Sequence, residues 1–243
     1  MGCQCANQKD EDIDDLIPKN SYEEANEDEL QKDQDNNNFD QKEGIFGLTN
    51  REEEFQDNNN YLNQDRNAKY ADYPEKMLNL INKIREDPVA YADIIEDSIK
   101  NIIEEPNDNE IRKIYKRKVK VALTRGEEAF REAAELLRCM PSLPPLEFKN
   151  EICVPLPENE EEIKDSSYLK EQVKIIRENA NIDVFYKDLV KIPEVSALLM
   201  IVDDSGKNPG RKRDAVLSKD FKYIGITSKF IGKVFIAYFT FSS

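Results

Sequence analysis

The sequence predicts an α/β fold, an α-β-α sandwich in which a small antiparallel sheet lies between two layers of helices. The residues from Ala197 to Val202 are all apolar, which is typical of a helix that is buried on most of its sides. The segment from Tyr223 to Phe241 has the pattern of two strands joined by a turn at Gly232. Both faces of the second strand, Val234 to Phe241, are apolar. Such a strand needs cover on both sides of its sheet.

The charge distribution divides the 243-residue chain into an N-terminal tail, residues 1–72, and a folded domain, residues 73–243. Residues 1–74 contain 20 Asp and Glu but only 7 Lys and Arg, whereas the remaining 169 residues contain 30 and 28. The tail is also rich in Asn and Gln, and its few apolar residues are scattered. Such a composition cannot form a core, so we predict a largely disordered acidic tail.

The chain begins Met-Gly-Cys-Gln-Cys-Ala, which resembles the dually acylated N termini of Src-family kinases and G-protein α subunits. The resemblance implies myristate on Gly2 and palmitate on Cys3 and Cys5, although Ala6 stands where Ser or Thr is usual. One myristoyl chain gives only marginal membrane binding, so the two cysteines would supply the second anchor. The alternative is an accidental Gly-Cys start. Acylation at Gly2 would place the domain in the cytosol, where Cys139 and Cys153 are expected to be buried free thiols.

The domain is expected to begin with two helices. Met77, Leu80, Ile81 and Ile84 repeat at helical spacing after Pro74. Asp87 and Pro88 are typical of an N-cap and a first helical position, and the apolar stripe after them continues to Ile102.

The middle of the domain is less regular. The stretch from Arg112 to Arg125 contains seven Lys and Arg and no acid; we predict an exposed helix face, with a lipid-headgroup or partner contact as the alternative. Further helices are expected from the apolar repeats at 130–137 and 169–176. Pro155 and Pro157 interrupt helix formation between them. Residues 181–186 are expected to form a short strand.

Three segments of the domain carry short motifs that occur together in a known family. The first is the helix ending Asn82-Lys83-Ile84-Arg85, which has the pattern Leu-x-x-x-Asn-x-x-Arg. The second, residues 143–150, reads Leu-Pro-Pro-Leu-Glu-Phe-Lys-Asn. The third runs from the apolar helix through Asp203-Asp204 and Arg211-Lys212-Arg213 to the Phe-Lys-Tyr-Ile-Gly-Ile sequence at 221–226. These segments resemble the CAP superfamily of cysteine-rich secretory, antigen 5 and pathogenesis-related proteins, also called SCP-like domains, whose Pro-Leu-x-Trp-Asn segment would have Phe148 in the Trp position. The resemblance implies the α-β-α sandwich.

The catalytic and metal-binding residues of that family have no counterpart in this sequence. The family's site has two His and two acidic residues around a cleft, but this chain contains no His, and Lys212 occupies one histidine position. Because imidazole is the commonest neutral metal ligand and general base, we predict no metal site, no cofactor and no enzymatic activity. Asp203 and Asp204 are expected to bond loop amides or solvent. The basic residues Arg211, Lys212 and Arg213 could contact an anion or a partner; the alternative is a solvated loop.

We therefore expect a non-catalytic, membrane-anchored CAP/SCP-like binding or scaffold module on the cytosolic face of a plasma or ciliary membrane. Its partners would be the membrane, through the acyl chains, and a protein that the sequence does not identify. The alternatives are a lipid or sterol carrier, a cytoskeletal or ciliary structural component and, least favoured, a hydrolase. The net charge of −15 and the single aromatic residue of the basic stretch, Tyr115, argue against nucleic-acid binding.

Overall fold

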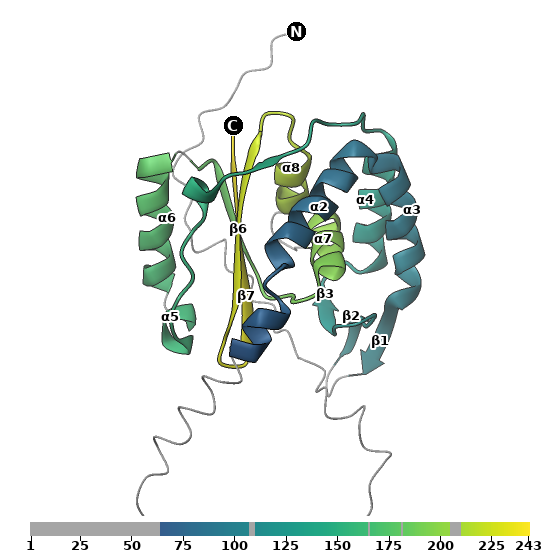
Figure 1. Ribbon diagram of the computed structural model, residues 1–243. Coiled ribbons are helices and arrows are strands. Elements are labelled where there is room, and N and C mark those ends of the chain that lie inside the picture. The colour runs from purple at the N-terminus through teal and green to yellow at the C-terminus, as the bar shows by residue number, and fades with distance from the viewer. Residues whose placement is uncertain (1–63, 107–109, 165, 181, 205–209) are drawn as a thin grey trace, which may run out of the picture.

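The computed structural model describes residues 64–106, 110–164, 166–180, 182–204 and 210–243. They form a mixed α/β fold with two β-sheets (Figure 1). The predicted tail, apart from its last residues, lies outside this part of the chain.

The larger sheet has four strands in the order β4-β6-β7-β5. Its centre is the predicted hairpin, in which β6 (Tyr223–Ile231) and β7 (Val234–Ser242) pair antiparallel across a turn with Gly232 at a φ of 61°. The predicted short strand is β5 (Val184–Asp188), which pairs with β7. The sheet is not wholly antiparallel, because β4 (Glu147–Phe148) runs parallel to β6. The hairpin and its third strand are thus confirmed.

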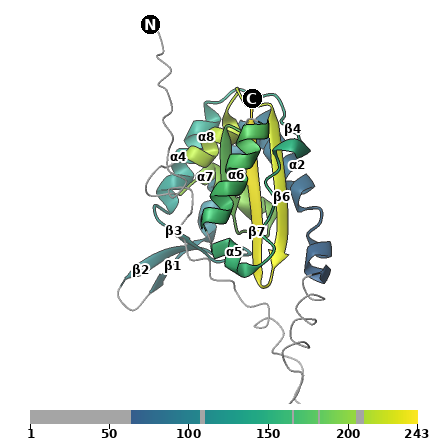
Figure 2. The ribbon, with the colours of Figure 1, turned by 90° about the vertical axis from the view of Figure 1, so that its left-hand side faces the viewer.

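The two faces of β7 belong to two separate apolar clusters. Phe235, Ala237, Phe239 and Phe241 lie in the larger cluster, and Ile236 and Tyr238 lie in the smaller one. Both faces of the sheet carry helices (Figures 1 and 2). The smaller cluster includes side chains of α6 (Ser166–Ala180), which follows the short helix α5 (Glu160–Lys164). The predicted cover on both sides is therefore present.

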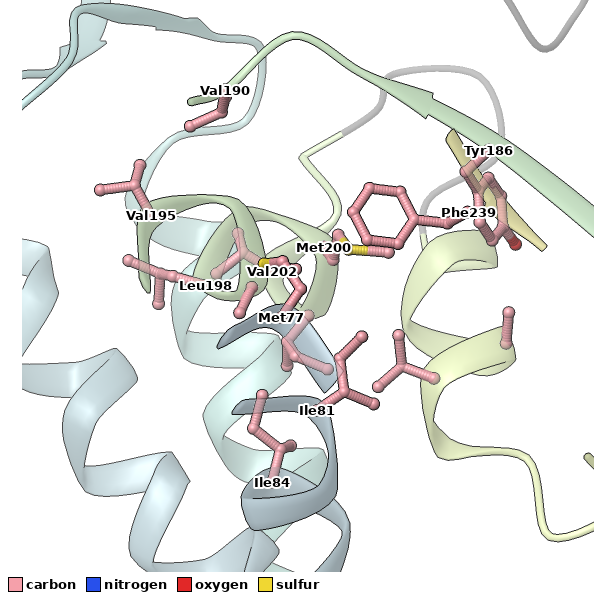
Figure 3. Packing of buried hydrophobic residues seen from close by; sticks show 14 of the residues in the cluster. Met77, Ile81, Ile84, Tyr186, Val190, Val195, Leu198, Met200, Val202 and Phe239 are labelled. Carbon is pink, nitrogen blue, oxygen red and sulfur yellow. The ribbon is translucent and has the colours of Figure 1, made fainter. Parts of the chain in front are cut away.

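The larger cluster is built around α7 (Pro193–Val202), the helix predicted to be buried. Seven of its ten residues are buried, and Figure 3 shows Met200 and Phe239 pointing toward one another. The other helices that contribute to the cluster are α2 (Tyr73–Glu86), α3 (Pro88–Ser98), α4 (Glu127–Arg138) and α8 (Arg211–Leu217).

The start of α3 is as predicted, but its end is not. The carboxylate of Asp87 accepts a hydrogen bond of 2.9 Å from the amide of Ala90, and Pro88 is the first helical residue. The helix ends at Ser98 and a 3₁₀ turn, η3 (Ile99–Asn101), follows. Ile102 belongs instead to strand β1 (Ile102–Pro106), where it pairs with Tyr115. Ile102 therefore pairs with Tyr115 of the neighbouring strand, although the spacing of the apolar residues before it is helical.

The basic stretch is not a helix, so that prediction is wrong. It forms β2 (Ile111–Tyr115), an exposed turn at 116–118, and β3 (Val121–Leu123), which with β1 make a second, antiparallel sheet. The reason is that Tyr115 and Val121 are buried in the larger cluster. β-branched and aromatic residues favour a pleated, half-buried surface over a solvated helix.

The packed chain begins before Tyr73. Residues 64–69 are helical, and the side chain of Asn67 forms hydrogen bonds with the backbone at the edge of β6. Its amide nitrogen donates to the carbonyl of Phe230 at 3.3 Å and its side-chain oxygen accepts from the amide of Phe230 at 2.5 Å. The carboxamide therefore acts as a strand partner and covers a backbone edge that would otherwise be open to another chain.

Candidate functional site

The start of α8, which carries the candidate contact residues Arg211, Lys212 and Arg213, is bonded to the end of α7. Asp203 is the C-cap residue and has a left-handed conformation with a φ of 43°. Its carboxylate accepts a hydrogen bond of 2.7 Å from the amide of Lys212, in the first turn of α8. Burial raises the pKa of Asp203, and the amide bond and the cations of Lys212 and Arg213 act against that rise. The carboxylate thus joins two helices.

The neighbouring carboxylate of Asp204 is held in a cradle of three backbone amides. It accepts hydrogen bonds from Arg125 at 2.8 Å and from Gly126 at 3.0 Å, and also from Thr124. Gly126 adopts a φ of 62° at this turn, a conformation that glycine adopts readily. Burial raises the pKa of Asp204 and the amide bonds oppose it. Asp203 and Asp204 are therefore both bonded to backbone amides, as predicted.

The structure separates the three cations that the sequence groups together. Arg211, Lys212 and Arg213 do not lie in a loop but begin α8, after Gly210 with a φ of 91°. Arg211 and Lys212 are half-buried, whereas Arg213 is only 4% exposed. A turn of helix points consecutive side chains in different directions, so the three do not form one basic surface.

Arg213 is used inside the fold. Its Nη2 donates to Glu132 of α4 at 2.6 Å, and the other carboxylate oxygen of Glu132 accepts from Arg125. Hydrogen bonds from both arginines lower the pKa of Glu132, and the bond from Arg125 has the larger effect. In the described part of the chain, Nε and Nη1 of Arg213 are buried without hydrogen-bond partners. Among the described residues, Glu132 is therefore the carboxylate to which the buried Arg213 donates a hydrogen bond.

Replacing Glu132 with Gln should lower the free energy of unfolding at pH 7 by about 2 kcal/mol, because Arg213 loses its charged partner. This figure is below that for a fully buried pair, since the Glu132 side chain is 42% exposed. The pKa of Glu132 is depressed in the fold, so its contribution is present above its unfolded pKa and is lost as pH falls through the folded pKa.

Urea unfolding at pH 7 and at successively lower pH measures this difference. The matched control is Glu128→Gln, which removes an exposed carboxylate that pairs with Arg125 at 3.4 Å. Equal effects of the two substitutions, or a difference that persists at acid pH, would show that Arg213 does not depend on Glu132.

A second group of polar residues joins α2 to residues 144–146. Asn82 on α2 pairs with the backbone of Leu146, donating to its carbonyl at 3.0 Å and accepting from its amide at 2.7 Å. Arg85, one turn later, donates to the carbonyls of Pro144 at 2.8 Å and Val216 at 2.7 Å. The sequence analysis placed both residues in a motif but did not predict that they bind the backbone of distant segments. Their spacing of three, on the helix face that carries Ile81 and Ile84, is the signal that they point inward.

The remaining predicted residues are dispersed. Gly2, Cys3 and Cys5 lie outside the described residues. Cys139 and Cys153 are free thiols, but neither is buried as predicted: Cys139 is exposed and Cys153 is partly buried. Cys139 follows the last turn of α4, whose amphipathic stripe ends with Leu137. Burial raises the pKa of the Cys153 thiol, which makes it less reactive.

Neither a membrane span nor a metal cluster is found among the residues that the structure describes. None of their helices has the length and apolar character needed to cross a bilayer. They also contain no cluster of three or more His, Cys, Asp or Glu side chains placed to hold a metal ion.

Comparison with known proteins finds no relative of this chain. No protein-family model, no curated protein and no solved structure matches the chain.

Proposed function

We propose that this protein is a non-catalytic binding or scaffold module with a CAP/SCP-like α-β-α sandwich, anchored to the cytosolic face of a membrane by acyl chains on Gly2, Cys3 and Cys5. The observation that carries the CAP-like assignment is that the three resembling segments contact one another. The three segments are separated in the sequence, and no single motif contains the residues of another.

The contacts between the segments are specific. Asn82 and Arg85 of the first segment bind the backbone of Pro144 and Leu146 in the second. The second segment forms β4, where the amide of Glu147 donates to Lys222 at 2.8 Å and that of Lys149 donates to Ile224 at 2.9 Å, both in the third segment. These contacts support the proposal because they place the three segments in one part of the fold.

The chemistry of the site favours binding over catalysis. A general acid or base must be free to exchange a proton with a substrate. Asp203 and Asp204 instead accept hydrogen bonds from backbone amides, and Glu132 lies between two arginines. These acids hold α4, α7 and α8 together, which is a structural task.

The anchoring part of the proposal predicts a clear change in membrane recovery. Gly2→Ala should move the protein from the membrane fraction to the soluble fraction, because no myristate can be attached. Cys3→Ser combined with Cys5→Ser should leave weak, reversible attachment, since a single myristoyl chain binds membranes only marginally. Fractionation of cells expressing each variant measures this.

Cys139→Ser is the matched control, because Cys139 is an exposed thiol at the end of α4, and this variant should remain with the membranes. Unchanged membrane recovery of the Gly2→Ala protein would refute acylation at Gly2 as the anchor. Loss of the Cys139→Ser protein from membranes would mean that the cysteines act through a different site.

A further inference from the structure

The second sheet carries a surface that the proposed function does not use. The β1–β2 ribbon projects from the body of the domain (Figure 2). Together with the turn after β2 it displays exposed cations from the acid-free stretch, namely Arg112, Lys113, Lys116, Arg117 and Lys118. We call this surface, residues 102–106 and 111–120, the basic ribbon.

Part of this charge has no ion-pair partner in the described part of the domain. Lys116 and Lys120 both pair with Glu105, and Arg112 lies 3.7 Å from Glu110. Among the residues that the structure describes, Lys113, Arg117 and Lys118 have no carboxylate within ion-pair distance.

The basic ribbon is also partly apolar. Ile111 is 68% exposed and Ile103 is 36% exposed. A surface with unpaired cations and exposed isoleucines fits an acidic segment with interspersed apolar residues.

Such a segment is present in the same chain. Residues 64–243 contain 30 Lys and Arg against 32 Asp and Glu, whereas residues 1–63 contain 5 against 18. The densest acidic segment is residues 10–29, with ten Asp and Glu, one Lys, and the apolar residues Ile13, Leu16 and Ile17. We propose that residues 10–29 dock on the basic ribbon of the same molecule.

The connecting chain is long enough for this contact. The described chain begins at Gln64, in the helical segment 64–69, which is tied to the β6–β7 turn by a bond of 3.4 Å from Arg66 to the carbonyl of Gly232. This helical segment and the basic ribbon lie at the same end of the molecule in both views (Figures 1 and 2). The 34 residues between Glu29 and Gln64 can extend over about 110 Å. A domain of this size has a radius of gyration of about 16 Å.

The charge of the chain favours the tail over an anionic bilayer as the occupant. The chain carries a net charge of −15, so an anionic leaflet would repel most of it. The tail is covalently linked, which makes its contact with the ribbon intramolecular and raises its effective concentration. Docking would also hold the domain close to the N-terminus. This inference does not require acylation of Gly2 or the CAP-like assignment.

The test uses full-length protein without acyl chains and a fluorescent peptide of residues 10–29. In one background, the ten acids of residues 10–29 are changed to Asn or Gln, which frees the ribbon. Fluorescence anisotropy at low salt should show that the peptide binds this neutral-tail protein at least about tenfold more tightly than the wild type, whose own tail occupies the ribbon.

The cations of the ribbon should account for this binding. K113Q/R117Q/K118Q in the neutral-tail background should weaken it by about tenfold, and added salt should have the same effect. The matched control K83Q/K219Q/K222Q removes the same charge from three exposed lysines outside the ribbon, and should leave affinity within about twofold. Circular dichroism confirms that each variant is folded.

Several results would overturn the proposal. These are no binding of the peptide to the neutral-tail protein, equal binding to the wild type, or equal losses in the ribbon and control variants. A further arm uses phosphatidylcholine vesicles containing phosphatidylserine. If the ribbon substitutions abolish vesicle binding while the peptide neither binds nor competes, the basic ribbon is a membrane surface and not a site for the tail.

Discussion

Arg85→Met should lower the free energy of unfolding by about 3–5 kcal/mol, the largest effect expected for a polar residue of this protein. The Arg85 side chain is 0% exposed. It donates through Nε to Pro144, and through Nη1 to Val216 at 2.7 Å and Ser218 at 2.8 Å. These three carbonyls lie on two chain segments that are distant in sequence. Methionine fills a similar volume but would leave them without a donor.

The size of the effect follows from two opposing contributions. Each hydrogen bond from a charged donor contributes about 1.5–3 kcal/mol, and orphaned buried carbonyls add to the loss. Against this, a buried guanidinium carries a desolvation cost that methionine avoids. In the part of the chain that the structure describes, Arg85 has no carboxylate partner, and burial lowers its pKa. The free energy lost with the three hydrogen bonds therefore exceeds the desolvation cost that methionine avoids. The net loss is smaller than the summed contributions of the three bonds.

Urea unfolding followed by circular dichroism measures the change. Arg131→Met is the matched control, because Arg131 lies on the exposed face of α4 and pairs with Glu127 of the same helix. It should cost less than about 0.5 kcal/mol. If Arg85→Met cost less than about 1 kcal/mol, the clamp between α2, residues 144–146 and the end of α8 would not contribute to stability.

Phe239→Ala should destabilise the protein by about 3–5 kcal/mol, because it removes a large side chain from the centre of the core. Phe239 is 0% exposed, and on the sheet it lies between Ile226 of β6 and Tyr186 of β5. Its ring packs in the larger cluster with Met200 of α7 (Figure 3). Alanine would leave a cavity between the sheet and α7, which the surrounding helices can only partly close.

The stability of this variant is measured in the full-length protein. A shorter fragment beginning at residue 75 is unsuitable, because it would lack Asn67 and Tyr73, which contact β6 and the core. Phe148→Ala, in which the phenylalanine is 46% exposed on an edge strand, is the control and should cost about 1 kcal/mol or less. Similar losses for both variants would contradict the position of β7 between two layers.

The local elements of this fold could be predicted from the sequence because their signals are short-range. Six apolar residues in a row predicted the buried helix α7, and Asp87-Pro88 predicted the start of α3. The double-sided apolar pattern of β7 predicted helices on both faces of its sheet. In each case the residues that carry the pattern also form the element, so no distant partner has to be known.

The predictions that failed depend on distant partners. Residues 111–123 became strands because β1 pairs with β2 and because Tyr115 and Val121 reach the larger cluster. Arg211 to Arg213 became the start of α8, where Asp203 accepts from the amide of Lys212 and Glu132 pairs with Arg213. A run of positive charge looks the same in a solvated loop, a helix or a strand. Only contacts from elsewhere in the chain separate these cases.

The sequence by itself determined which segments are apolar, where charge accumulates, and that no histidine is available for metal binding or catalysis. The tertiary structure alone decided that Arg213 is internal while Lys113, Arg117 and Lys118 remain exposed. It also brought Asn82 and Arg85 to the backbone of residues 144–146. The physical reason is that the cost of burying a charged or polar group depends on its hydrogen-bond partners, and these partners lie about 60 to 130 residues away in the chain.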